Sequence, residues 1–98
     1  MPDRTLIPEL DLHGLGVKEA LETTREFLEI SRRAGVLKVA VIFGKGRGSP
    51  GGEGVLRLVV PKAMETDWTD LVLAWRRLID PDGRDKGAEV DLRPPEGA

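Results

Sequence analysis

The chain has 98 residues, a formal net charge of −2, and a composition that is 40% hydrophobic and 33% charged. This length and balance are typical of one globular domain with a single core, and they exclude a disordered chain. Cysteine is absent and histidine occurs once, which excludes a disulfide framework and a structural zinc site.

No apolar run is long enough to cross a bilayer, and the first residues lack the layout of a signal peptide. We therefore expect a cytoplasmic protein without a membrane partner. Neither an internal repeat nor a second domain is visible, so we expect residues 1–98 to form one domain, ordered over residues 7–93.

The first half of the chain predicts a strand followed by a helix. Residues 7–13 alternate in polarity, so that Asp11 and His13 share the polar face of the predicted strand. Residues 17–34 carry apolar side chains at the spacing of an amphipathic helix. Gly35 then predicts the end of that helix.

The next segment predicts a central strand and a loop. Residues 36–43 form a nearly continuous β-rich run, typical of a strand buried on both faces. Residues 44–54 contain six glycines, and we expect no regular element there.

The remaining elements complete a β-α-β-α-β-β order. Residues 55–65 predict a helix that kinks or restarts near Val60, because Pro61 follows. Residues 71–75 predict a third strand, residues 76–87 a charged loop, and residues 88–93 a fourth strand with one wet face.

This order brings two segments together if the first two strands are parallel neighbours. Their carboxyl ends then lie at one edge of the sheet, which places His13 beside Gly44 and near the start of the helix over 55–65. Open α/β sheets bind ligands at that edge, where a helix also offers its free N–H groups.

Asp11 and His13 are the candidate catalytic pair. A carboxylate beside an imidazole orients it and raises its basicity, which supplies half of a general acid–base apparatus for phosphodiester or ester chemistry. The alternative is a surface pair at a strand end with no chemical role.

The glycine loop is the candidate phosphate site. Glycines allow backbone N–H groups to close on an anion, while Lys45, Arg47 and Ser49 offer side-chain donors. Charges between residues 43 and 62 sum to +3 on a chain that is acidic overall. The alternative is a flexible loop without a ligand. The G-x-G-x-x-G match at residues 46–51 follows the second strand rather than the first, so we interpret it as fortuitous.

The two tryptophans, Trp68 and Trp75, offer either base stacking or core packing, and core packing is favoured for Trp75 because it ends an apolar strand.

The segment Leu10–Gly14, read L-D-L-H-G, resembles the signature of the small MutS-related (Smr) domain. The glycines at residues 44–46 and the helix start Gly54–Arg57 are similar to further parts of that family's pattern. The resemblance implies an α/β two-layer (α+β) sandwich, like the C-terminal domain of translation initiation factor three. Its four-stranded mixed sheet would have the order 1-2-4-3, with strand four antiparallel to the others.

The resemblance also implies work on nucleic acid, because Smr domains are found as DNA-nicking endonucleases and as endoribonucleases, some of them acting on ribosome-associated RNA. Carried over, Asp11 and His13 would be catalytic. Gly44, Lys45, Gly46, Arg47, Ser49 and Arg57 would bind the nucleic acid or its phosphates. The chain looks like a stand-alone member of the family. We expect an endonuclease that favours RNA over branched or nicked DNA, without a cofactor, with the monomer favoured; its need for a divalent metal stays open.

Phe43 departs from the pattern, because many members with demonstrated cleavage carry histidine before the Gly-x-Gly loop. The single histidine of this chain excludes a two-histidine mechanism. The first alternative is therefore a non-catalytic module that binds structured nucleic acid or the ribosome. A protein–protein adaptor, suggested by the acidic net charge, is the second.

Overall fold

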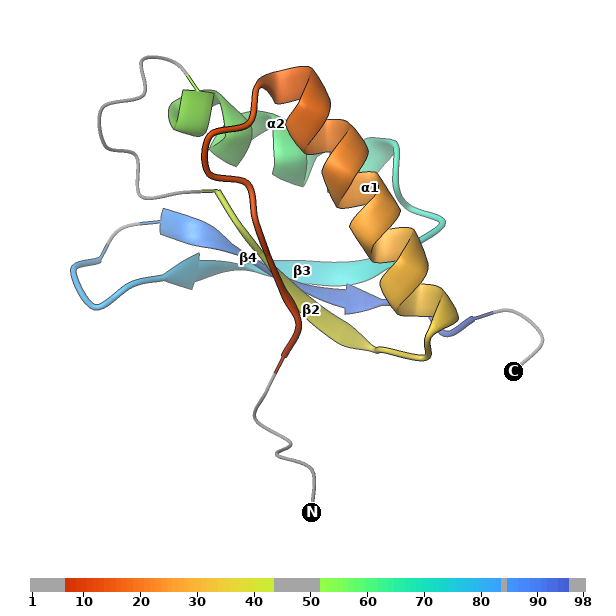
Figure 1. Ribbon diagram of the computed structural model, residues 1–98. Coiled ribbons are helices and arrows are strands. Elements are labelled where there is room, and N and C mark those ends of the chain that lie inside the picture. Colours follow the sequence, from red (N-terminus) through yellow and green to blue (C-terminus); the bar gives the residue numbers. More distant parts are fainter. Residues whose placement is uncertain (1–6, 44–51, 84, 96–98) are drawn as a thin grey trace.

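A computed structural model describes residues 7–43, 52–83 and 85–95 of the chain. The four strands form one sheet in the order β1-β2-β4-β3, in which β1 pairs parallel with β2, and β4 runs antiparallel to β2 and β3. Both helices cover the same face of this sheet, so the domain has two layers (Figure 1). The expected α/β sandwich, strand order and antiparallel fourth strand are confirmed. The elements are β1 (Glu9–Asp11), α1 (Val17–Arg33), β2 (Lys38–Ile42), α2 (Gly52–Thr66), β3 (Val72–Ile79) and β4 (Asp85–Leu92).

The core lies between the helices and the covered face of the sheet. Helix α1 buries Ala20, Thr24, Leu28 and Ser31, which recur every three or four residues and therefore form one stripe. Gly35 follows the helix with φ +86°, a left-handed conformation that glycine adopts without steric cost. The predicted helix over 17–34 is thus confirmed to within one residue. Neither helix is long and apolar enough to cross a membrane, within the part of the chain that the structure describes.

Strand β2 is central, as predicted, and its middle residues are buried on both faces, although helices cover only one of them (Figure 1). Val39 and Val41 point into the core, while the alternate residues face the open side of the sheet. Ala40 on that open side is nevertheless only 5% exposed. It lies in register between Glu9 of β1 and Glu89 of β4, whose longer side chains flank the small alanine. The apolar run therefore reflects a central position rather than a second helical layer.

The predicted charged loop over 76–87 is also wrong, because most of it belongs to β3 and β4. Arg76 on the open face bonds the carboxylates of Glu89 and Asp91, with 2.7 Å between its Nη2 and Asp91 Oδ2. Lys38 of β2 lies 3.8 Å from each of the same two carboxylates. These ion pairs between neighbouring strands stabilise charged side chains on the solvent-exposed face of the sheet. A charged segment can therefore form a strand at this position.

Helix α2 begins earlier than predicted, at Gly52 inside the glycine segment. It continues through Pro61, which rules out the restart that the sequence analysis gave as one of two outcomes, while the kink stays a prediction. Glycine costs least in the first turn, where backbone N–H groups have no intrahelical partner in any case. Pro61 removes one hydrogen bond, but its ring is buried beside the fully buried Val60, so packing holds the helix together.

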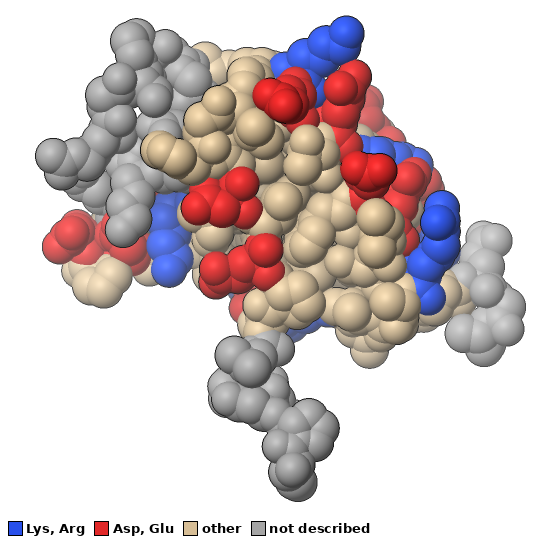
Figure 2. All heavy atoms as spheres, in the orientation of Figure 1, with Lys and Arg blue, Asp and Glu red and all other residues tan. Residues whose placement is uncertain are grey.

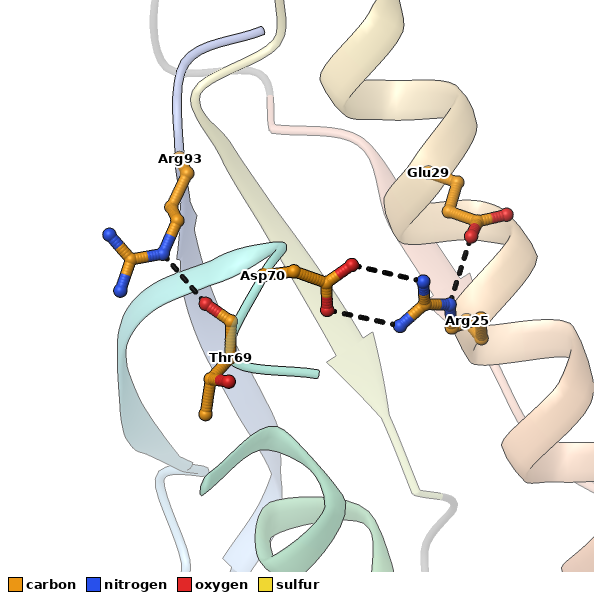
Figure 3. A network of polar contacts seen from close by, with 5 residues as sticks. All are labelled: Arg25, Glu29, Thr69, Asp70 and Arg93. Carbon is orange, nitrogen blue, oxygen red and sulfur yellow. Dashed lines mark hydrogen bonds and ion pairs between the residues drawn. The ribbon is translucent and has the colours of Figure 1, made fainter. Parts of the chain in front are cut away.

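A polar network fastens α1 to the end of the sheet where β3 begins (Figure 3). Arg25 donates from both terminal nitrogens to the Asp70 carboxylate, at 3.1 and 3.2 Å, and from Nε to Glu29 at 2.9 Å. Arg93, which follows β4, donates from Nε to the Thr69 carbonyl at 2.7 Å. The hydrogen bonds from Arg25 hold the pKa of Asp70 below its ordinary value.

Candidate nucleic-acid interface

The strands β1, β2 and β3 all end at one edge of the sheet, which we call the rim. Asp11 pairs in register with Ile42, and the Leu12 N–H extends the ladder by donating to the Ile42 carbonyl at 2.8 Å. On the other side of β2, the Phe43 N–H donates to the Lys86 carbonyl at 2.9 Å. The predicted convergence of the two parallel strand ends is therefore confirmed.

Asp11 and His13 lie at this rim, and both are exposed. The backbone N–H of His13 donates to Asp11 Oδ1 at 2.8 Å. The chain then turns at Gly14, whose φ is +82°, and the Leu15 N–H closes the turn on the Leu12 carbonyl at 3.1 Å. Asp11 thus fixes the turn that carries His13. That its carboxylate also orients the imidazole stays a prediction.

The predicted phosphate loop falls mostly outside the described residues. Those positions are Gly44, Lys45, Gly46, Arg47 and Ser49. The described chain leaves the sheet at Phe43 and continues with α2 at Gly52.

Arg57 is the one predicted phosphate contact that the structure places, on α2 just after its first turn. The residue is half-buried, and its Nε is buried without a hydrogen-bond partner in the described part of the chain. An unused buried donor is costly unless something accepts from it. Arg57 therefore retains hydrogen-bonding capacity that the described fold does not use.

Phe43, the residue that departs from the pattern described above, is fully buried in the core. Its side chain stabilises the fold and takes no part in rim chemistry. Trp68 is also a core residue, and the half-buried Trp75 packs against that core while its Nε1 donates to Glu65 at 3.0 Å. Arg77 lies 5.3 Å from the Trp75 ring centre, close enough for a cation–π contact. The core role favoured for Trp75 is confirmed.

The sequence reasoning missed a pocket at the rim, to which all four strands or their turns contribute. It has a volume of about 360 Å³ and lies between β1 and the turn that joins β3 to β4. Figure 2 shows acidic side chains over β1 and at the tip of that hairpin, with a basic side chain between them. The lining consists of Glu9, Asp11, Ile42, Asp80, Pro81, Asp82 and Lys86.

Four carboxylates and one ammonium group make this pocket acidic, in contrast with the basic loop predicted beside it. Within residues 7–43, 52–83 and 85–95, no three carboxylate or imidazole groups are arranged to hold a metal ion. The sequence already indicates that Glu9 and Asp11, two residues apart on a strand, lie on the same face of the sheet. It does not indicate that Asp80 and Asp82 lie close to them, because residues 76–87 were predicted as a loop rather than as a hairpin.

The sequence of this chain matches one family model and resembles two known proteins. The family model described as "Smr domain" matches residues 10–93. A 64-residue segment, 65% of the chain, is 42% identical to Endonuclease MutS2 of Symbiobacterium thermophilum, and a 46-residue segment, 47% of the chain, is 46% identical to that of Pelotomaculum thermopropionicum. These matches span only 7% and 6% of the two relatives.

Solved structures share the fold. The Smr domain of Thermus thermophilus MutS2 superposes with a TM-score of 0.73 and 31% identity, covering 90% of this chain and all of that one. The SMR domain of NEDD4-binding protein 2 gives 0.65 and 27%, over 100% and 99% of the chains. YdaL of Escherichia coli, a stand-alone small MutS-related protein, gives 0.70 and 24%, over 87% and 63%, which shows the fold. With the family model matched from β1 to the end of β4, the chain belongs to the Smr domain family.

Proposed function

We propose that this Smr domain is a nucleic-acid-binding endonuclease that cleaves phosphodiester bonds, in RNA rather than DNA. Membership of the Smr family supports the proposal, as does similarity to proteins named Endonuclease MutS2. The observation that carries it is the rim itself. Asp11 ends β1 in register with Ile42, close to the point where β2 leads toward the glycine loop, and His13 follows in the turn rather than on the strand as predicted.

In the proposed mechanism His13 transfers the proton, and Asp11 holds the turn and stabilises the imidazolium. Lys45, Arg47 and Arg57 stabilise the charge that develops on the phosphate. If the 2′-hydroxyl of RNA is the nucleophile, His13 accepts its proton as the oxygen attacks phosphorus, a 2′,3′-cyclic phosphate forms, and the 5′-oxygen leaves as a hydroxyl with a proton taken from water. That route cuts only RNA and needs no metal.

The test incubates labelled RNA and DNA of the same sequence with the wild type, His13→Ala and Asp11→Asn, with and without EDTA. Asparagine keeps an oxygen that accepts from the His13 N–H, so Asp11→Asn removes the charge while preserving the turn. Loss of His13 should lower the rate by about 10²–10⁴-fold, the usual contribution of general acid–base catalysis. Glu22→Gln on the exposed side of α1 is the matched control. Equal cleavage by all four proteins would remove the pair from the mechanism.

Phe43 favours a second candidate function, a non-catalytic module for structured nucleic acid or the ribosome. The core holds this side chain, and the chain has a single histidine, so a second imidazole is not available. Such a module would bind RNA in a salt-dependent way and form no product. Lys45→Ala and Arg47→Ala would weaken that binding. An affinity that does not change with ionic strength would contradict this second candidate function.

A further inference from the structure

Three charged side chains of the pocket at the rim surround a space without pairing with one another. The side chains of Glu9, Asp82 and Lys86 make no ion pair or hydrogen bond with any described residue, although all three line the same pocket. Ile42 and Pro81 supply apolar surface between them. Oppositely charged groups that line one cavity and stay apart leave room for a ligand that offers hydrogen-bond donors and an acceptor.

From this lining we propose that the pocket binds one unpaired guanine base of the nucleic acid, next to the candidate catalytic Asp11; the inference rests on the proposed function. A pocket of about 360 Å³ lies near the lower end of the range for small-molecule sites, roughly 300–1,000 Å³, which suits a single base. Proteins read single-stranded RNA by taking up such unstacked bases.

The acidic lining decides which part of a nucleotide enters. Phosphate is excluded, because four carboxylates face the pocket and would repel it. A metal ion is disfavoured by the arrangement, because no three acidic or imidazole groups within the described residues are placed to coordinate one. A neutral base with N–H donors satisfies the carboxylates without adding negative charge.

Among the four bases, guanine fits this set of groups best. Its Watson–Crick edge carries two adjacent donors, N1–H and the N2 amino group, which a carboxylate accepts together, and beside them the O6 acceptor that a lysine recognises. Uracil presents two carbonyl oxygens on either side of a single N–H, so carboxylates repel most of its edge. Adenine and cytosine each offer one amino group and no neighbouring N–H donor on that edge.

Binding to four RNA hairpins tests the proposal. The hairpins are identical except that one unpaired loop position is guanine, adenine, cytosine or uracil, and fluorescence anisotropy gives each affinity at fixed salt. The His13→Ala protein is used throughout so that cleavage does not consume the probe. Glu9→Gln, Asp82→Asn and Lys86→Met are introduced into it one at a time, with Glu22→Gln as the control that lies outside the pocket. Circular dichroism verifies that each variant folds.

The guanine hairpin should bind about tenfold or more tightly than the uracil hairpin, and the pocket variants should bring this ratio close to one. Glu22→Gln should leave the ratio unchanged. Equal affinity for all four hairpins in the parent protein, or a preference that survives all three pocket variants, would overturn the base pocket and leave the proposed function standing. A preference for adenine or cytosine would overturn the assignment to guanine. No binding of any hairpin would refute the proposed function itself.

Discussion

Replacing Gly87 by alanine should destabilise the domain more than any other glycine substitution in its described part. A Cβ at this position would lie 2.2 Å from the Val41 carbonyl oxygen and 3.0 Å from the Ile42 Cα, both of them backbone atoms of β2. Neither can rotate away, so β2 and β4 must separate. Overpacking of this kind costs about 1–3 kcal/mol. In a domain of this size each 1 kcal/mol lowers Tm by roughly 4–8 °C, so we expect a loss of about 4–24 °C.

Gly16→Ala is the matched control, because it makes the same chemical change where no atom lies within 4 Å and φ is −73°. There the loss of an N-cap glycine and the gain from a less flexible unfolded chain oppose each other, so Tm should change by only a few degrees. Thermal unfolding followed by circular dichroism measures both proteins. Equal Tm values for Gly87→Ala and Gly16→Ala would refute the reasoning that a close strand contact fixes the rim.

Three further predictions concern stability. Phe43→His should cost about 2–4 kcal/mol in urea unfolding, because it buries a polar ring where the wild type buries an apolar one, and an unchanged midpoint would contradict the core position of this residue. Thr24→Val should raise the unfolding free energy by about 1 kcal/mol, because it removes a buried hydroxyl that lacks a hydrogen-bond partner among the described residues while keeping the shape of the side chain. Ion pairing with Arg25 and Arg76 lowers the folded-state pKa of Asp70 and Asp91, so their stabilisation is complete above the unfolded pKa near 4 and is lost as pH falls further. Tm measured from pH 2 to pH 6 should therefore drop at the acid end, and Asp70→Asn should make that dependence shallower.

Local patterns in the sequence were enough to predict the elements whose apolar side chains recur at a regular spacing. The α1 helix has one apolar face and a terminal glycine, and both signals act within the helix itself. Strand β1 and strand β2 were found from alternation and from a β-rich run, although both proved shorter than predicted. The strand order came from the family resemblance, because nothing in a single sequence states which strands are neighbours.

The features that the sequence analysis missed depend on contacts between elements that lie far apart in the sequence. Arg76 looked like part of a loop because its partners, Glu89 and Asp91, lie 13 and 15 residues further along the chain. Pro61 looked like a helix break because its cost is local, while the packing that offsets it comes from other elements. The acidic pocket was missed for the same reason, since it forms only when the hairpin between β3 and β4 reaches the end of β1.

The proposed site therefore separates two kinds of recognition by charge. The basic residues Lys45 and Arg47 would hold phosphates, and the acidic pocket would select a base. Because these tasks oppose each other electrostatically, variants should separate them. Lys45→Ala should lower the affinity for all four hairpins and leave their ratio unchanged. Glu9→Gln should instead lower the guanine preference without a general loss of affinity, since removing a negative charge favours every RNA. If Lys45→Ala also changed the guanine preference, or if Glu9→Gln weakened the binding of all four hairpins equally, phosphate and base would share one set of contacts, and the division of the rim into two subsites would be wrong.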